Sequence, residues 1–112
     1  MMEKRGPKMK LVTKSILRRF KRQGDTNGMN AEDVKVPVKF FDACSNWTWY
    51  PIEYDEESRT FFGWVTGFES ELGYFCLDEL EGVRNKLGLP LERDLNWNSE
   101  TTLADVMSGK EH

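Results

Sequence analysis

The fold is decided by the stretch between residues 47 and 77, which reads WTWYPIEYDEESRTFFGWVTGFESELGYFCL. Three segments rich in aromatic and β-branched residues alternate along it with short polar connections: 47–54, 60–66 and 71–77. This composition predicts strands, and connections of four or five residues join antiparallel neighbours. The stretch therefore predicts an antiparallel meander.

A fourth strand is predicted over residues 34–41, where Val34, Val36, Val38 and Phe40 alternate with other residues. Pro37 has no N–H group to donate to a sheet, which favours an edge position for this strand.

Within 47–54, a period of two predicts that Trp47 and Trp49 share one face of the sheet. The same period places Tyr50, Ile52 and Tyr54 together on the other face.

Helices are predicted before and after the meander in the sequence. Residues 13–22 show helical spacing after the N-cap Thr13, residues 78–87 are followed by Gly88 and Pro90, and Thr102 begins a short helix that runs to Met107. Residues 89–98 are expected to be extended. The prediction is one α+β domain over residues 9–108, with a flexible extension (1–8) before it and a frayed tail (109–112) after it.

The charge of the chain is unevenly distributed. Residues 1–24 contain nine Lys or Arg residues and one acid, whereas residues 25–112 contain seven bases and eighteen acids. An acidic body of this kind repels nucleic acid and attracts proteins that bind nucleic acid.

Several function classes are disfavoured by the residues present. The single histidine is His112, and neither a phosphate-binding loop nor a calcium loop occurs, so we expect no enzymatic activity, no metal and no cofactor. Cys44 and Cys76 lack metal-binding or redox spacing and are expected to be reduced. No segment reaches the roughly 20 apolar residues of a membrane span, and no secretory signal is found, so a cytoplasmic protein without membrane contact is expected.

The candidate partner-binding residues are of three kinds. Acids near the predicted connections could form a surface that imitates phosphates, a solvated face without a partner or, as a third alternative, a carboxylate catalytic site; they are Glu53, Asp55, Glu56, Glu57, Glu69, Glu71, Asp78, Glu79 and Glu81. Aromatic residues could serve the core or anchor a partner; the candidate anchors are Trp47, Trp49, Tyr50 and Trp64. Basic residues of the first helix could touch phosphates or simply face solvent; they are Lys14, Arg18, Arg19, Lys21 and Arg22.

An ordered series of phrases resembles a known family: MKLVTK (9–14), PVKFF (37–41), NWTWY (46–50), EYD (53–55), FFGW (61–64), GFE (67–69), ELGYF (71–75), ELE (79–81) and LGLPLERD (87–94). The chain resembles, over residues 9–106, a small bacterial family labelled only as a domain of unknown function. Its members are common on plasmids, phages and other mobile elements, and the resemblance implies Met9 as the usual start.

The resemblance also implies a function, because at least one protein similar to this family is an anti-CRISPR inhibitor of Cas9. The expected partner is Cas9 or its complex with guide RNA, in the cytoplasm of a bacterial host. Since Cas9 holds nucleic acid in positively charged channels, the acidic body is expected to compete with target DNA. The alternative is a nucleic-acid-binding accessory protein of a mobile element that acts through its basic N-terminal segment.

Overall fold

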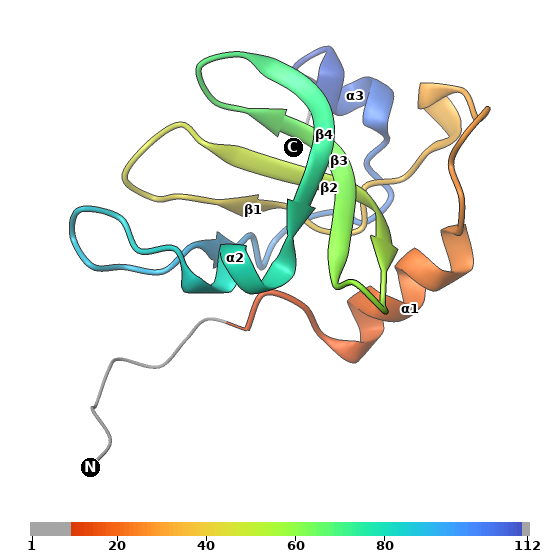
Figure 1. The fold of residues 1–112 in the computed structure, drawn as a ribbon. Helices are drawn as coiled ribbons and strands as arrows, with labels where there is room; N and C mark the ends of the chain where they lie inside the picture. Colours follow the sequence, from red (N-terminus) through yellow and green to blue (C-terminus); the bar gives the residue numbers. More distant parts are fainter. Residues whose placement is uncertain (1–9, 111–112) are drawn as a thin grey trace.

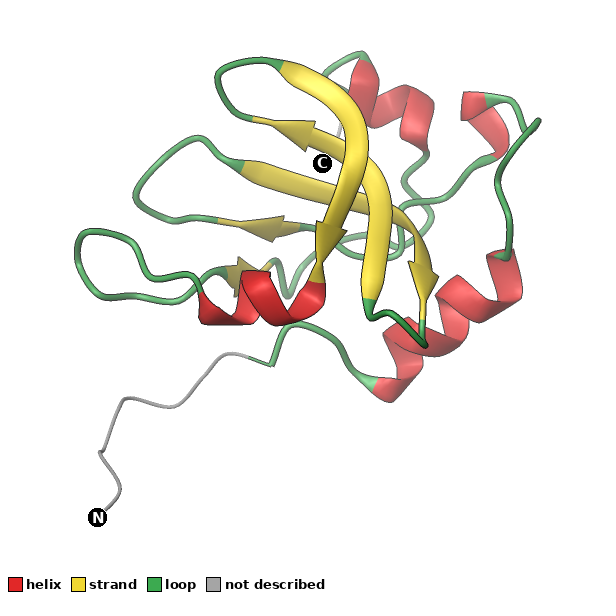
Figure 2. Ribbon diagram, in the orientation of Figure 1, coloured by secondary structure: helices red, strands yellow, loops and turns green. Residues whose placement is uncertain are grey.

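The computed structural model describes residues 10–110 and has the predicted α+β architecture (Figures 1 and 2). The helices are α1 (Lys14–Gln23), the 3-10 helix η1 (Ala31–Asp33), α2 (Leu77–Gly82) and α3 (Leu103–Met107). The strands are β1 (Phe40–Phe41), β2 (Thr48–Asp55), β3 (Thr60–Thr66), β4 (Ser70–Cys76) and β5 (Glu92–Arg93). The predictions for residues 1–8 and for the end of the tail lie outside the described residues.

The five strands form one antiparallel sheet in the order β4-β3-β2-β1-β5. The predicted meander is confirmed, since β1 to β4 are neighbours in chain order. Strand β5 comes from the segment expected to be extended and adds to the far side of β1, where Arg93 pairs with Phe40. The long strands β2, β3 and β4 therefore make one half of the sheet, and β4 forms its outer edge.

Helix α1 begins and ends close to its predicted bounds. The Thr13 hydroxyl accepts a hydrogen bond from the Ile16 N–H at 3.2 Å, which satisfies one of the free donors of the first turn. Gly24 ends the helix at φ +69°, a conformation that glycine adopts without a steric penalty. Phe20 is buried, so the apolar side of α1 lies on the sheet.

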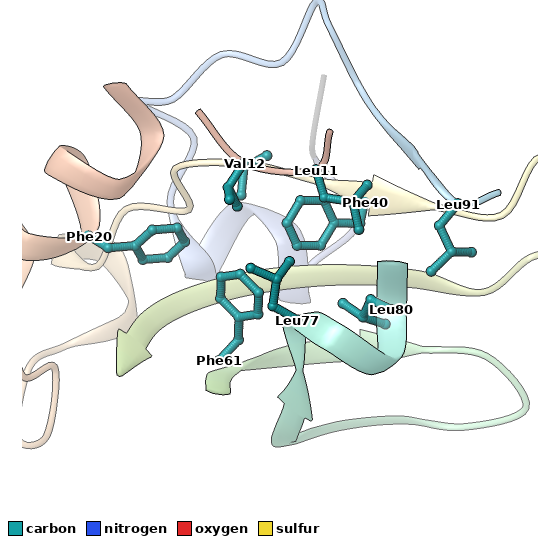
Figure 3. Close-up of a cluster of buried hydrophobic side chains, with 9 residues drawn as sticks. Leu11, Val12, Phe20, Phe40, Phe61, Leu77, Leu80 and Leu91 are labelled. Atoms are coloured by element: carbon teal, nitrogen blue, oxygen red, sulfur yellow. The ribbon is translucent and has the colours of Figure 1, made fainter. Parts of the chain in front are cut away.

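The face of the sheet toward α1 and α2, here called the closed face, carries an aromatic and aliphatic core (Figure 3). Phe61 of β3 is 0% exposed, and its ring centroid lies 4.7 Å from that of Tyr54 and 5.5–5.6 Å from those of Phe20, Phe40 and Phe75. Such a ring contributes about 1.5–3 kcal/mol through burial and roughly 0.5–1.5 kcal/mol for each well-oriented aromatic pair.

The opposite face, here called the open face, has a second cluster under η1 and α3, which pack on each other. Tyr50 and Ile52 of β2 meet Leu103 and Val106 of α3 there. The predicted short C-terminal helix is confirmed with its cap, because the Thr102 hydroxyl accepts from the Asp105 N–H at 3.1 Å.

The predicted strand over residues 34–41 is wrong for all but its last two residues. Its alternating side chains are buried, but Val34 and Val36 belong to the open-face cluster whereas Val38 and Phe40 belong to the closed-face cluster. The segment crosses between the two faces, and its backbone bonds go elsewhere: the Val36 N–H donates to the Thr101 carbonyl at 2.8 Å.

The predicted helix over residues 78–87 is also wrong in its second half, because α2 ends at Gly82. The Arg84 guanidinium donates to the carbonyls of Glu81 and Val83 at 3.1 and 2.8 Å, and the Asn85 side chain accepts from the Leu87 and Leu89 N–H groups at 2.9 and 3.0 Å. These bonds offer the backbone an alternative to the helix, as asparagine commonly does. Leu87 is consequently 69% exposed.

The predicted face of Tyr54 is wrong because β2 contains a bulge between Pro51 and Glu53. The extra residue Ile52 reverses the alternation, so Tyr54 joins the closed face while Tyr50 and Ile52 stay on the open face. The backbone at this point is held by Gln23, whose side-chain amide donates to the Ile52 and Lys35 carbonyls, both at 2.9 Å, and accepts from the Lys35 N–H at 2.8 Å.

Candidate functional site

The nine candidate acids do not form one surface. The β2–β3 turn and α2 bring six of them to one end of the meander, here called the acidic end: Asp55, Glu56, Glu57, Asp78, Glu79 and Glu81. Glu69 lies in the β3–β4 connection at the opposite end of the same strands. With about 3.3 Å per residue, seven-residue strands separate the two ends by roughly 20 Å.

Arg59 links the two parts of the acidic end, the β2–β3 turn and α2. Its Nε and Nη2 atoms lie 3.0 and 2.9 Å from Asp78 Oδ1, and Nη2 lies 3.9 Å from Glu81 Oε1. This pairing raises the pKa of Arg59 above its ordinary value, chiefly through the hydrogen bond to Asp78. Arg59 also takes a left-handed conformation, φ +55°, at the end of the hairpin turn. The turn and α2 are joined by the ion pair to Asp78 and by the Leu77 N–H, which donates to the Arg59 carbonyl at 2.9 Å.

Asp55 closes the turn itself. Its carboxylate accepts from the Ser58 hydroxyl at 2.5 Å and from the Ser58 N–H at 3.3 Å, which lowers its pKa below the ordinary value of 3.8. The exposed carboxylates of Glu56 and Glu57 are thereby presented on an ordered loop.

Glu53 has an internal role. Its carboxylate accepts from the Thr26 N–H at 2.8 Å and from the Thr26 hydroxyl at 2.6 Å, and Thr26 is buried. The side chain fastens the loop after α1 to the sheet.

The candidate aromatic anchors are divided among different places. Trp47 and Trp49 stack with ring centroids 6.1 Å apart on one face, as expected, and the Trp47 ring meets Phe68 edge-on at 5.8 Å. Tyr50 is 4% exposed and packs on Trp97, and Trp64 packs on the open-face cluster, so both serve the core. Phe68 is 93% exposed at the tip of the β3–β4 connection and makes the most prominent apolar side chain of this end.

The candidate basic residues of α1 are mostly exposed. Lys14, Arg18, Lys21 and Arg22, here called the basic stripe, are all exposed, whereas Arg19 is half-buried. Lys21 and Glu56 line the same small cleft beside Tyr54. The basic stripe therefore adjoins the acidic end.

A groove of about 500 Å³ lies on the open face, between β4, the loop after α1 and α3. Its apolar lining includes Phe62, Leu72 and Tyr74 of the sheet and Met29 and Met107 from outside it. Sequence reasoning did not find it, because its walls come from segments far apart in the chain. The only local signal is the Asn27-Gly28 turn, which gives no indication of what it faces.

Within residues 10–110 there is no helix long and apolar enough to cross a membrane. No group of three or more His, Cys, Asp or Glu side chains in the same range could hold a metal ion. Cys44 and Cys76 are both free, as expected.

The fold and these surfaces define a small α+β protein whose accessible chemistry consists of an acidic end, a basic stripe and an open groove. The chain belongs to the family described as "Protein of unknown function (DUF2958)", which matches residues 11–110. This confirms the expected membership of a family labelled only as a domain of unknown function. No curated protein and no solved structure matches the chain.

Proposed function

We propose that this protein binds an RNA-guided nuclease of the Cas9 class and inhibits it by occupying a surface that target DNA would use. The observation that carries the proposal is the acidic end, where the β2–β3 turn and α2 bring six carboxylates to one end of the meander and Arg59 pairs with two of them, Asp78 and Glu81. The family resemblance supplies the identity of the partner, and the charge supplies the mode of binding.

The geometry of the acidic end suits a competitor of nucleic acid. A positively charged channel that holds nucleic acid attracts a cluster of carboxylates, and ordered side chains lose less conformational entropy on binding than flexible ones. The turn hydrogen bonds of Asp55 and the ion pair between Arg59 and Asp78 provide that order.

The neighbouring basic stripe adds a second contact of opposite charge. Because Lys21 and Glu56 line the same cleft, a partner that meets the acidic end also comes near α1. The stripe is suited to guide RNA or to carboxylates of the nuclease, which makes the combined surface selective for a partner with both signs of charge.

The test is a DNA-cleavage assay with Cas9 proteins from several sources, with this protein added before or after guide RNA and before or after target DNA. The expected result is inhibition when the protein is added before target DNA and little inhibition when it is added afterwards. Unimpaired cleavage by every nuclease at a large molar excess would contradict the proposal.

A matched pair of variants separates charge position from total charge. Glu56→Lys with Glu57→Lys reverses two charges at the acidic end, and Glu69→Lys with Glu71→Lys reverses two at the opposite end. We expect the first pair to weaken inhibition about tenfold or more and the second pair to change it little. Equal effects would indicate nonspecific electrostatics.

The alternative function, nucleic-acid binding by an accessory protein of a mobile element, is favoured by the exposure of the basic stripe. It predicts binding of DNA or RNA that weakens with salt, with a slope that falls by about one for each cation removed. Arg18→Gln with Arg22→Gln tests this, and Lys86→Gln, at an exposed site away from α1, is the control. Absence of a mobility shift at low salt would exclude it.

A further inference from the structure

Strand β4 has one unused edge. It is the outermost strand of the sheet, and within residues 10–110 no strand pairs with its outer side (Figure 1). Natural edge strands are commonly protected against pairing by lysine, proline or a bulge. Ser70–Cys76 contains no lysine or proline, its single charged residue is Glu71, and its register with β3 is regular throughout.

The hydrogen bonds at the two ends of β4 show which of its backbone N–H and C=O groups point away from β3. The Gly67 N–H donates to the Glu69 carbonyl at 3.1 Å, and the Leu77 N–H donates to the Arg59 carbonyl at 2.9 Å. Both pairs continue the β3–β4 register, and hydrogen-bonded pairs recur every second residue of an antiparallel ladder.

Residues 71, 73 and 75 therefore direct their backbone groups toward β3. Leu72 and Tyr74 direct their N–H and C=O groups to the outside, where another strand could bind.

The side chains of Leu72 and Tyr74 line the groove on the open face. They are 42% and 78% exposed, so the wall of the groove nearest the free edge is apolar and accessible. Its volume of about 500 Å³ lies within the range of clefts that bind small ligands. A strand added beside β4 would project every second side chain toward this groove.

The charge of the groove distinguishes between occupants. Its charged lining residues are Asp25 and Glu53. The Glu53 carboxylate is bound to Thr26 inside the protein, whereas the Asp25 carboxylate accepts a local hydrogen bond from the Asn27 N–H at 2.9 Å and is exposed. A second copy of this chain would bring the same carboxylates to the groove, and like charges repel. Its Tyr74 would remain part of its own strand β4. A cationic segment of another protein suits the charge of the groove, because Asp25 is exposed on its lining.

We propose that β4 and the groove bind an extended peptide segment of another protein, which adds a sixth strand to the five-stranded sheet. The segment has apolar residues at alternate positions, directed into the groove, and a basic residue next to Asp25. This site is separate from the acidic end, so it goes beyond the proposed function and does not depend on it.

The test uses a fluorescein-labelled peptide of about nine residues that alternates valine with threonine and ends in two lysines. A matched peptide with the valines replaced by proline is the negative control, because proline cannot donate to a sheet. We expect saturable binding of the first peptide by fluorescence anisotropy and none of the second.

Two variants locate the binding. Leu72→Pro removes an N–H group that points away from β3, so every donor to β3 remains. Met107→Lys places a positive charge on the lining of the groove, where it repels the lysines of the peptide. Each is expected to weaken binding about tenfold or more, whereas Glu71→Gln, whose backbone faces β3, leaves it unchanged. Circular dichroism confirms that each variant is folded.

Three outcomes would overturn the proposal. The first is no saturable binding up to about 1 mM peptide. The second is equal binding by Met107→Lys and the unmodified protein. The third is a dimer in sedimentation experiments that Leu72→Pro dissociates and the peptide does not, which would assign the edge to a second copy.

Discussion

The closed and open faces of the sheet are covered by different means. Two helices and the segment before α1 cover the closed face, where Phe61 touches four other rings. On the open face, η1, α3 and Trp97 cover only part of the surface, and a groove remains. The comparison shows that packed rings seal the closed face, whereas the open face keeps an accessible groove.

The largest expected effect comes from truncating one ring on each face. Phe61→Ala removes a ring that is fully buried and should lower the free energy of unfolding by about 3–5 kcal/mol. Phe62→Ala removes the neighbouring, half-buried ring next to Tyr74 and should cost about 1 kcal/mol. Urea unfolding measures both, and similar values would contradict the difference between the faces.

The next effect concerns Gln23, whose side chain bonds the β2 bulge at Ile52. The residues that follow this bulge change from one face of the sheet to the other. Gln23→Ala leaves the Lys35 N–H and the carbonyls of Lys35 and Ile52 without this partner. We expect a loss of about 2 kcal/mol, since each unsatisfied buried group costs about 1–3 kcal/mol when water does not reach it. Hydrogen exchange at Lys35 should become faster, and unchanged exchange would show that the amide is not what holds this segment.

The next comparison concerns two glycines that face each other across β3 and β4. A Cβ atom at Gly63 would lie 2.6 Å from Pro51 Cα and also meet the Tyr50 carbonyl, whereas at Gly73 nothing lies within 4 Å. Gly63→Ala should cost about 1–3 kcal/mol, and Gly73→Ala should be neutral or stabilising by about 0.4–1 kcal/mol. Thermal unfolding of the two variants gives the comparison directly, and equal melting temperatures would refute it.

The smallest expected effect is a dependence on pH at Asp42, which joins the β1–β2 loop to Asn85. The Cys44 N–H and then the Asn85 amide, both 3.0 Å from the carboxylate, hold its pKa below 3.8. A carboxylate with a depressed folded-state pKa stabilises the fold above its unfolded pKa, and this contribution disappears as pH falls through the folded value.

The unmodified protein should therefore be more stable than Asp42→Asn at neutral pH, and the difference should shrink below about pH 4. Urea midpoints measured across this range test the sign. A difference that grows on acidification would be the opposite of the expected result.

The sequence predicts elements well where local chemistry and tertiary packing agree. Thr13 and Thr102 mark the starts of α1 and α3 because their hydroxyls cap the first turn in the final structure. Residues 34–39 defeat the same reasoning, since alternating burial arises there from a segment that crosses between two cores. The β2 bulge is a third case. The extra residue Ile52, whose carbonyl is bound by the Gln23 amide, moves Tyr54 to the face opposite the one that strict alternation predicts.

The acidic character of the candidate site could be predicted from the sequence, but the positions of all its residues could not. Acidic residues of the β2–β3 turn and α2 converge because antiparallel strands return to the same end, which a meander implies. The same topology sends Glu69 to the other end and turns Glu53 toward Thr26. The groove depends on contacts between α3, β4 and the loop after α1, and such long-range contacts leave no local pattern.

The two free cysteines give this protein built-in reporters of where a partner sits. Cys76 lies at the start of α2 beside the acidic end, and Cys44 lies in the loop before β2, at the end that carries Phe68. Both thiols are half-buried, so a thiol reagent should modify each at its own measurable rate. A partner on the acidic end should slow modification of Cys76 alone, which locates binding by mass spectrometry without changing a single residue.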